Sequence, residues 1–257
     1  MDNLQQSIAA CCKQLRLSSS LAERAMIQDG ASHQEFLLGL LSDEIEYRRR
    51  ARITKYLNTA GFPKRYEVGQ FQPEEVIFPE ETSLKSLLNL DFYHQGKNVL
   101  MYGSTGTGKT MLSILLGMEA CRQGVPVQFY RTAGLINRFS ESQAKQKLSA
   151  LKKKLNSAEI LILDEFGYVP YDRTGAQLLF DYLSEIEGQK SIILNTNLQF
   201  SQWVNVLYDQ KMTTALIGRL THHVELILFP GKNHRLLESS VNEAFGRMAN
   251  TMKEVSP

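Results

Sequence analysis

One glycine-rich segment constrains the fold of this chain more than any other. Residues 103–110 read Gly-Ser-Thr-Gly-Thr-Gly-Lys-Thr and fit the pattern G-x-x-x-x-G-K-[ST]. The apolar residues Val99–Tyr102 before it predict a strand, and the amphipathic stretch Met111–Ala120 after it predicts a helix. A loop in this setting points successive backbone N–H groups at phosphate oxygens, and the helix dipole adds positive potential. The segment therefore predicts a P-loop that binds a nucleoside triphosphate.

The P-loop pattern also assigns roles to single residues. We expect the Lys109 ammonium to reach the β- and γ-phosphates of ATP, and the Thr110 hydroxyl to bind Mg²⁺. The predicted cofactors are therefore ATP and Mg²⁺. The residues expected to contact the nucleotide through this loop are Gly103, Ser104, Thr105, Gly106, Thr107, Gly108, Lys109, Thr110 and Met111.

Two acidic residues end a second apolar segment. Residues 160–165 read Ile-Leu-Ile-Leu-Asp-Glu, which predicts a buried strand with carboxylates at its C-terminal end, where α/β sheets place ligand chemistry. We expect Asp164 to hold Mg²⁺, directly or through water, and Glu165 to orient and activate the attacking water. Many buried strands end in an acid. This one follows the P-loop with one strand–helix unit between them, so the two segments together predict an ATPase.

A third buried strand is predicted at residues 191–197, Ser-Ile-Ile-Leu-Asn-Thr-Asn. In P-loop ATPases with an additional strand, this strand lies between the P-loop strand and the acidic strand, and its terminal polar residue senses the γ-phosphate. We assign that catalytic role to Asn197, with Asn195 as the alternative. An asparagine that only forms a turn after a strand gives the same pattern.

From Lys97 onward, apolar strands alternate with amphipathic helices. Strands are expected at residues 98–102, 125–130, 159–163, 191–196 and 224–229, and helices begin near Lys109, Thr132, Arg173, Ser201 and Gln210. Alternation of this kind implies an α/β fold in which helices cover both faces of a parallel five-stranded sheet.

The part of the chain before this alternation reads as helical. Ser20 and Ser32 each begin an S-x-x-E capping box, and apolar residues recur at helical spacing after Ser32. Pro63, Pro73 and Pro79 then break the periodicity. We expect a small all-helical N-terminal domain for interaction or DNA binding over residues 1–62, a linker over 63–80, the ATPase domain over 81–240 and a C-terminal tail over 241–257.

Composition limits the environment and the partners. The chain has 257 residues, of which 43% are hydrophobic and 22% charged, with a net charge of +2. This is an ordinary globular balance, so a nucleic-acid surface would have to come from clustered charges. The three cysteines have no CxxC or metal-ligand spacing, and the sequence contains no signal-peptide pattern and no apolar run of membrane-spanning length. We expect a soluble, cytoplasmic protein with no membrane partner.

Two basic clusters are candidates for contact with DNA phosphates. The first lies in an acid-free stretch, and the second lies on the predicted N-terminal helix, where three of its members share a face through i, i+4, i+7 spacing. Solvated helix faces give the same pattern. The candidate DNA-binding residues are Lys145, Lys147, Lys152, Lys153 and Lys154 in the first cluster, and Arg48, Arg52 and Lys55 in the second.

Taken together, these segments resemble the IstB family of AAA+ ATPases, the helper proteins of bacterial insertion-sequence transposition, and more distantly the DnaC/DnaI helicase loaders. Besides the P-loop, the likeness is specific in residues 164–170, Asp-Glu-Phe-Gly-Tyr-Val-Pro, in residues 197–203, Asn-Leu-Gln-Phe-Ser-Gln-Trp, and in residues 219–223, Arg-Leu-Thr-His-His. Two motifs depart from the family. Its Thr-Ser-Asn reads Asn-Thr-Asn at residues 195–197, and its Gly-x-Ser-Tyr-Arg reads Gly-Lys-Asn-His-Arg at residues 231–235.

The resemblance implies an AAA+ domain that binds ATP at the interfaces of a homo-oligomer. It also implies assembly on double-stranded DNA, and recruitment of a transposase of the same element that stimulates hydrolysis. For Arg219 the resemblance implies a catalytic arginine finger given to the neighbouring subunit, and for Arg235 it implies contact with the nucleotide. We interpret His222 and His223 as packing or capping residues, because the sequence offers no third metal ligand.

Two alternatives remain open from the sequence. A loader of a replicative helicase, of the DnaC/DnaI kind, would use the N-terminal helices to grip a helicase instead of a transposase. A nucleotide-dependent scaffold would bind ATP with only incidental turnover. Against the scaffold, Asp164, Glu165, Asn197 and Arg219 are all present, and a pure binder does not need the full hydrolytic set.

Overall fold

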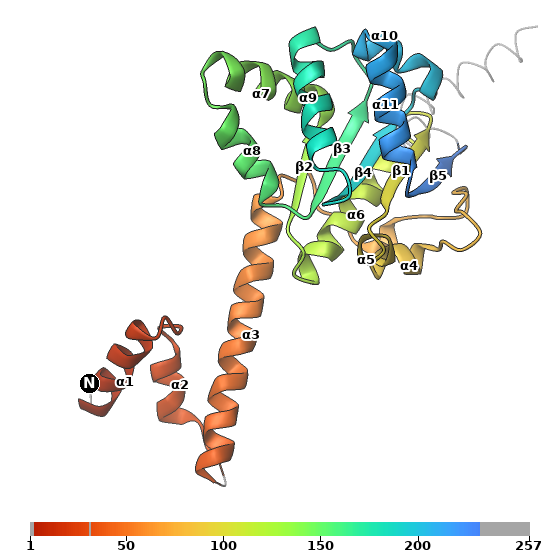
Figure 1. Cartoon of the computed structure of the whole chain (residues 1–257). Helices are drawn as coiled ribbons and strands as arrows, with labels where there is room; N and C mark the ends of the chain where they lie inside the picture. The colour runs from red at the N-terminus through yellow and green to blue at the C-terminus, as the bar shows by residue number, and fades with distance from the viewer. Residues whose placement is uncertain (1–2, 31, 232–257) are drawn as a thin grey trace, which may run out of the picture. The chain divides into compact units, whose positions relative to one another are not determined.

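The computed structural model describes residues 3–30 and 32–231. The chain divides into two compact units, Met1–Asn58 and Thr59–Pro257. Figure 1 labels the elements of both units along the chain. Arg235, expected to contact the nucleotide, and the predicted tail 241–257 lie outside the described residues.

The first unit is helical, as the sequence predicts. It contains α1 (Asn3–Gln14), α2 (Leu21–Ile27) and most of α3 (His33–Thr59). Ser32 caps α3 as expected, because its hydroxyl accepts a hydrogen bond from the Glu35 N–H at 3.2 Å. The capping box predicted at Ser20 is wrong: the Ser20 hydroxyl makes no capping bond to α2 and donates to the Ser18 hydroxyl instead.

A buried carboxylate ties the helices of the first unit together. Glu44 of α3 is only 4% exposed and accepts hydrogen bonds from the N–H and hydroxyl of Ser18, from Arg24 and from Arg48. Burial opposes the charge of Glu44, but the bonds from Ser18 and Arg48 outweigh burial and lower its pKa. The Glu44 carboxylate therefore links α2 and the loop before it to α3.

The second unit holds a five-stranded sheet in the order β2-β3-β4-β1-β5. Its strands are β1 (Asn98–Gly103), β2 (Val127–Arg131), β3 (Ile160–Phe166), β4 (Ser191–Thr196) and β5 (Val224–Phe229). All four pairings between neighbours are parallel, and the ribbon shows the strands side by side (Figure 1). The predicted fold class is confirmed, and so is the position of β4 between the P-loop strand and the acidic strand.

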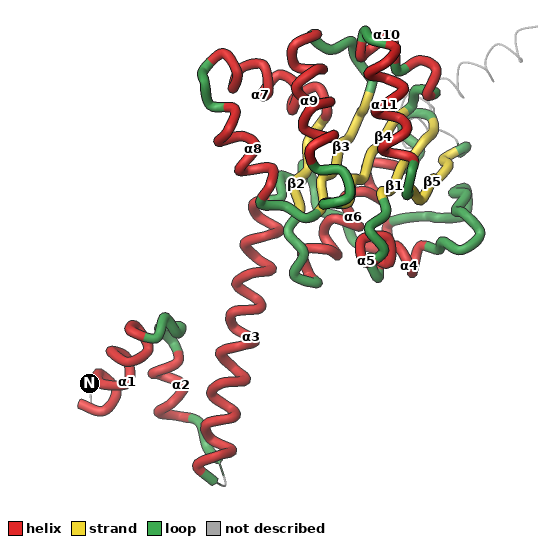
Figure 2. Tube along the Cα trace, in the orientation of Figure 1, coloured by secondary structure: helices red, strands yellow, loops and turns green. Residues whose placement is uncertain are grey.

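Helices pack against this sheet and connect its strands (Figure 2). They are α4 (Leu84–Leu88), α5 (Asp91–His94), α6 (Lys109–Arg122), α7 (Thr132–Ala144), α8 (Leu148–Asn156), α9 (Arg173–Glu185), α10 (Val204–Leu207) and α11 (Gln210–Thr221). Successive residues of a strand point to opposite faces. Leu161 and Leu163 of β3 accordingly share a core cluster with residues of α7, α9 and α11, whereas Ile162 lies against Gly117 of α6.

Residues 60–77 run from one edge of the sheet to the other. Ala60 accepts a hydrogen bond from the N–H of Phe129 on the edge strand β2, at 2.7 Å. Ile77 forms an antiparallel bridge with Leu228 on the opposite edge strand β5. Between these two points the chain contains only the short 3-10 helix Val68–Gln70. This crossing brings the segment close to the P-loop.

Candidate nucleotide-binding site

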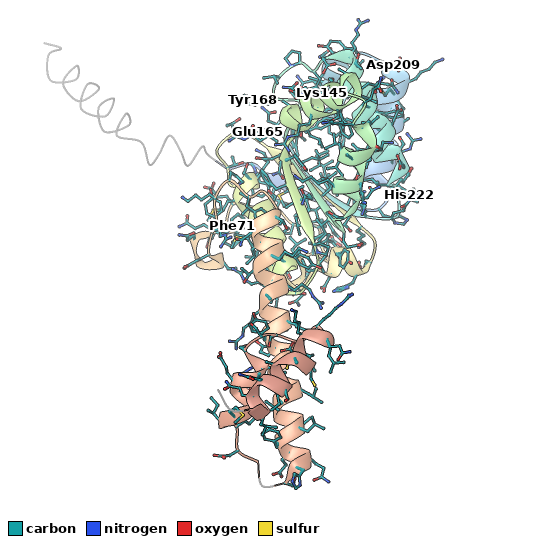
Figure 3. The ribbon with its side chains drawn as sticks, turned by 90° about the vertical axis from the view of Figure 1, so that its left-hand side faces the viewer. Phe71, Lys145, Glu165, Tyr168, Asp209 and His222 are labelled. Carbon is teal, nitrogen blue, oxygen red and sulfur yellow. The ribbon has the colours of Figure 1, made fainter. Side chains whose placement is uncertain are left out.

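A cleft with a volume of about 520 Å³ opens at the carboxyl end of the sheet. The P-loop, the ends of β3 and β4 and part of the crossing segment line it. Figure 3 labels three of its lining residues, Phe71, Glu165 and Tyr168. Ligands of open α/β sheets bind at this end of the strands.

The glycines at both ends of the P-loop are required by close approach and by backbone conformation. A Cβ on Gly103 would lie 2.2 Å from the carbonyl oxygen of Phe229. Gly108 has a φ of +103°, which disfavours any residue with a side chain, and it starts α6. The loop therefore folds tightly against β5 and ends at the N-terminus of α6, where free N–H groups favour an anion.

The side chain of Lys109 is folded over the loop that precedes it. Its Nζ donates to the carbonyl oxygens of Gly103 at 2.7 Å and Ser104 at 2.6 Å, and the residue is 9% exposed. A buried ammonium must have such partners. These carbonyls hold the positive charge within the cleft, next to the backbone N–H groups of the P-loop.

The acidic strand meets the P-loop through Asp164. The Thr110 hydroxyl lies 3.0 and 3.1 Å from the two carboxylate oxygens of Asp164, which is 2% exposed. Asp164 faces α6 because it follows Ile160 and Ile162 at intervals of two. Its backbone oxygen accepts a further bond from the Thr132 hydroxyl at 2.9 Å. The structure thus brings together the two residues predicted to bind the metal.

A bulge in β3 separates the two acidic residues. The pairing with β4 shifts between Leu163 and Phe166, and Glu165 has a φ of +56°. Phe166 therefore joins Leu163 in the same core cluster, whereas Glu165 is turned toward solvent and its side chain is 42% exposed. Regular alternation would have pointed Glu165 into that core. The bulge leaves Glu165 in the cleft, with its Oε2 3.6 Å from Nε of Arg131.

The two asparagines at the end of β4 lie in different environments. Asn195 is 1% exposed, and its Nδ2 donates to Asp164 Oδ1 at 2.8 Å and to Ser113 Oγ at 2.9 Å. Asn197, the residue preferred from the sequence, follows the strand, is exposed and lines the same cleft. Both therefore belong to the site, but Asn195 bonds Asp164, one of the two residues predicted to bind the metal, and Asn197 lines the open cleft.

This set of groups fits a nucleotide that carries its own Mg²⁺. Mg²⁺ binds few protein oxygens, typically one or two carboxylates, and takes the rest of its shell from phosphates and water. Thr110 and Asp164 supply such oxygens beside the phosphate-binding loop. Across residues 3–30 and 32–231, no three or more His, Cys, Asp or Glu side chains gather as a metal site.

The cleft also contains residues that sequence reasoning missed. Phe71 packs near Gly108, since a Cβ on this glycine would lie 3.4 Å from Phe71 Cε2, and Lys64 Nζ lies 5.1 Å from the ring centre of Tyr66. The aromatic residues between Pro63 and Pro73 were the signal that could have indicated a part in the binding site. The prolines alone, however, predict a linker. The additional lining residues are Lys64, Tyr66, Gln70, Phe71, Gln72, Tyr168 and Thr196.

Arg219 lies apart from this cleft. It lines a separate cavity of about 250 Å³ together with Asn98, the first residue of β1, so the cavity is at the opposite end of the strands. Its Nε lies 3.0 Å from Glu187 Oε2, and its guanidinium lies 5.2 Å from the ring centre of Phe180. In this chain Arg219 therefore does not line its own nucleotide cleft. The rings of His222 and His223 pack edge to face, with centres 4.3 Å apart.

The candidate DNA-binding residues differ in how they are paired. Lys145 lies 3.5 Å from Glu141, and Lys152 lies 2.5 Å from Glu185. Lys147, Lys153 and Lys154 are exposed. On α3, Arg48 bonds Glu44 and the carbonyl oxygen of Arg16, while Arg52 and Lys55 are exposed.

The fold and the cleft define the class of protein: this is an ATP-binding protein with the AAA+ P-loop fold. Similarity to one known family identifies the family within this class. Residues 10–242 match the profile of the IstB-like ATP binding proteins, and the chain belongs to that family.

Individual relatives and solved structures agree with this assignment. An insertion sequence IS21 protein of Pseudomonas aeruginosa, named as ATP-binding, is 32% identical over 85% of this chain and 82% of its own. An IS5376 protein of Geobacillus stearothermophilus, also named as ATP-binding, is 30% identical over 88% and 89%.

Among solved structures, the replication initiator DnaA bound to AMPPCP and single-stranded DNA is similar in fold. The TM-score is 0.52 at 19% identity, over 67% of this chain and 52% of that one. The chain thus spans about half of the DnaA structure, and the likeness shows the fold alone. No helix within the described ranges is long and apolar enough to cross a membrane.

Proposed function

We propose that this protein is a Mg²⁺-dependent ATPase that assembles on duplex DNA and recruits the transposase of its insertion sequence. The observation that carries the ATPase proposal is the convergence of four predicted residues, Lys109, Thr110, Asp164 and Glu165, on one cleft. The names of the relatives, which place them in insertion sequences, support the transposition context.

Each residue of the cleft has a distinct task in this proposal. The P-loop amides and Lys109 hold the phosphates, and Thr110 and Asp164 hold the metal ion, which supplies positive charge where the γ-phosphoryl group becomes more negative. Glu165 accepts the proton of the attacking water, and its exposed side chain is accessible from the cleft. Asn197, which also lines the cleft, orients the γ-phosphate and the water.

The remote position of Arg219 supports a homo-oligomer with ATP between subunits. Among the described residues of one chain, Lys109 is the cation that bonds the P-loop, whereas Arg219 lines the cavity at the other end of the sheet. A neighbouring subunit can present that surface to the cleft. We propose that Arg219 completes the neighbour's site and that Arg235 contacts the nucleotide.

For DNA we propose the exposed lysines after α7 and on α8, and the basic face of α3. Phosphate contacts of this kind are independent of sequence. Residues 1–62 would serve as the interaction and DNA-binding domain, 63–80 as a linker that also contributes to the cleft, 81–240 as the ATPase domain and 241–257 as a tail. The cytoplasm is the compartment in which this activity would take place.

Two variants test the ATPase proposal. Lys109→Ala should abolish ATP binding, because the phosphates lose their main point charge. Glu165→Gln should retain ATP binding and lower turnover by about a hundredfold or more, since the water loses its base. Glu159→Gln, just before β3, is the matched control and should retain wild-type turnover. Wild-type turnover in Glu165→Gln would show that Glu165 is not the base.

The helicase loader remains the second candidate function, and it shares the fold and the ATP site. Pull-down of the purified protein with an insertion-sequence transposase, and with a replicative helicase, separates the two. Selective capture of the helicase would favour the loader.

A further inference from the structure

We propose that Asn195 is a positioning residue for the metal side of the cleft, which holds the Asp164 carboxylate and thereby sets the affinity for Mg²⁺–nucleotide. This inference rests on the proposed ATPase function and deepens it. The role differs from γ-phosphate sensing, because Asn195 is buried against the metal-binding residues whereas Asn197 is exposed.

The orientation of the Asn195 amide is fixed by its partners. The oxygens of the Asp164 carboxylate accept hydrogen bonds, so the amide nitrogen of Asn195 faces it, at 2.8 Å. The Ser113 hydroxyl donates its proton to the Thr110 carbonyl oxygen at 3.0 Å, so Ser113 Oγ must accept from Asn195 at 2.9 Å. Both protons of Nδ2 are therefore committed, one to the α6 helix and one to Asp164.

This arrangement holds Asp164 from two sides. Thr110 of α6 donates to the Asp164 carboxylate from the P-loop side, and Asn195 donates from β4. Thr110 can keep this bond while its oxygen lone pairs serve the metal, because one hydroxyl both donates and accepts. Asn195 donates to Asp164 without also having to bind the metal. It is anchored on α6 through Ser113, so it fixes the carboxylate to the helix that carries the P-loop threonine.

The amide oxygen of Asn195 supports the same role. Asn195 Oδ1 is buried and has no hydrogen-bond partner among the described residues. Buried polar atoms of native proteins are almost always paired. Mg²⁺ in nucleotide sites keeps several water ligands. We assign Oδ1 as the atom that would accept a hydrogen bond from such a water when the metal is bound.

The test measures metal dependence by binding, without relying on turnover. A ribose-labelled fluorescent ATP analogue is titrated onto wild type and variants, first in EDTA and then at rising Mg²⁺. Asn195→Leu keeps the volume but removes donor and acceptor. It should leave the metal-free affinity within about twofold and raise the Mg²⁺ concentration for half-maximal binding by about tenfold or more, as for outer-shell partners of metal ligands.

Further variants keep the test decisive if Asn195→Leu folds poorly. Ser113→Ala leaves Asn195 in place but removes its anchor, and should shift the Mg²⁺ midpoint in the same direction by a smaller factor. Ser191→Ala alters a buried polar residue at the other end of β4 and is the matched control, with an unchanged midpoint. Circular dichroism confirms folding of each.

The outcomes separate this inference from the proposed function. Unchanged Mg²⁺ midpoints in Asn195→Leu and Ser113→Ala would overturn this inference. Mg²⁺-dependent binding by the wild type would still support the proposed ATP site. An equal loss of affinity with and without Mg²⁺ would also overturn it, because the amide would then act on the nucleotide or the fold. Absence of ATP binding by wild type would overturn the proposed function, and the inference with it.

Discussion

Arg131 and Glu165 form an ion pair across the ends of β2 and β3, with Nε and Oε2 3.6 Å apart. Arg131 is the last residue of the edge strand β2, and Glu165 is the bulge residue of β3. Glu165 lines the cleft, and both side chains of the pair are substantially exposed, at 65% for Arg131 and 42% for Glu165. In this chain the proposed catalytic base is therefore held by a cation that is not part of the P-loop.

Releasing Glu165 should raise basal turnover. Arg131→Gln removes the positive charge that draws the Glu165 carboxylate toward β2, so Glu165 becomes freer to reach the attacking water. The gain should not exceed about fivefold, because an exposed ion pair contributes at most about 1 kcal/mol. Steady-state ATP hydrolysis without DNA measures it, and the melting temperature should stay unchanged. A lower rate would mean that Arg131 instead orients Glu165 for catalysis.

The α8 lysines differ in their expected contribution to DNA binding. Lys153 and Lys154 are exposed and form no ion pair in the described ranges, whereas Lys152 is engaged by Glu185. Lys153→Ala combined with Lys154→Ala should weaken duplex binding at all sequences alike and reduce the salt slope by about 0.9 for each DNA phosphate that the variant no longer neutralises. Lys152→Ala is the matched comparison and should have a smaller effect. Identical salt slopes for wild type and the double variant would remove α8 from the DNA surface.

Mixing experiments test whether Arg219 acts on a neighbour. Arg219→Ala and Lys109→Ala should each be inactive alone, the first by about a thousandfold or more, as for other arginine fingers. When they are mixed on DNA, some interfaces pair an intact P-loop with an intact Arg219, so activity should partly return. Full DNA-stimulated turnover by Arg219→Ala alone would show that Arg219 is not an arginine finger. Its role would then be structural, through its local contacts with Glu187 and Phe180.

Acid should destabilise the N-terminal helices through Glu44. The pKa of Glu44 is lowered in the folded state, since hydrogen bonds to Ser18 and Arg48 outweigh burial. Its contribution is therefore complete above the unfolded value of 4.5 and is lost as pH falls through the folded value. Glu44→Gln should reduce the stability of this unit at pH 7 by about 2 kcal/mol and make that stability depend less on acid. Thermal melts between neutral and acidic pH measure both effects. Asp43→Asn, exposed on the same helix and only 3.9 Å from Arg24, should change both much less.

Much of the fold was predictable because periodicity is local. Each predicted strand overlaps an observed one, and helices begin at Lys109, Thr132, Arg173 and Gln210 as expected. The helix α8 was not predicted as a separate element, because its run of lysines reads as a charged patch. The Ser20 capping box failed because Glu44, distant in sequence, engages this region through Ser18 instead.

By itself the sequence determined the P-loop, the acidic strand end and the order of strands and helices, because these depend on residue types at fixed short spacing. Only the tertiary structure decided which groups meet in the cleft. The β3 bulge turns Glu165 out of the core, and β4 brings Asn195 to Asp164. The crossing segment brings Phe71 to the P-loop, and the strand direction puts Arg219 at the far end of the sheet. Each of these depends on contacts between residues far apart in the chain, which local spacing does not encode.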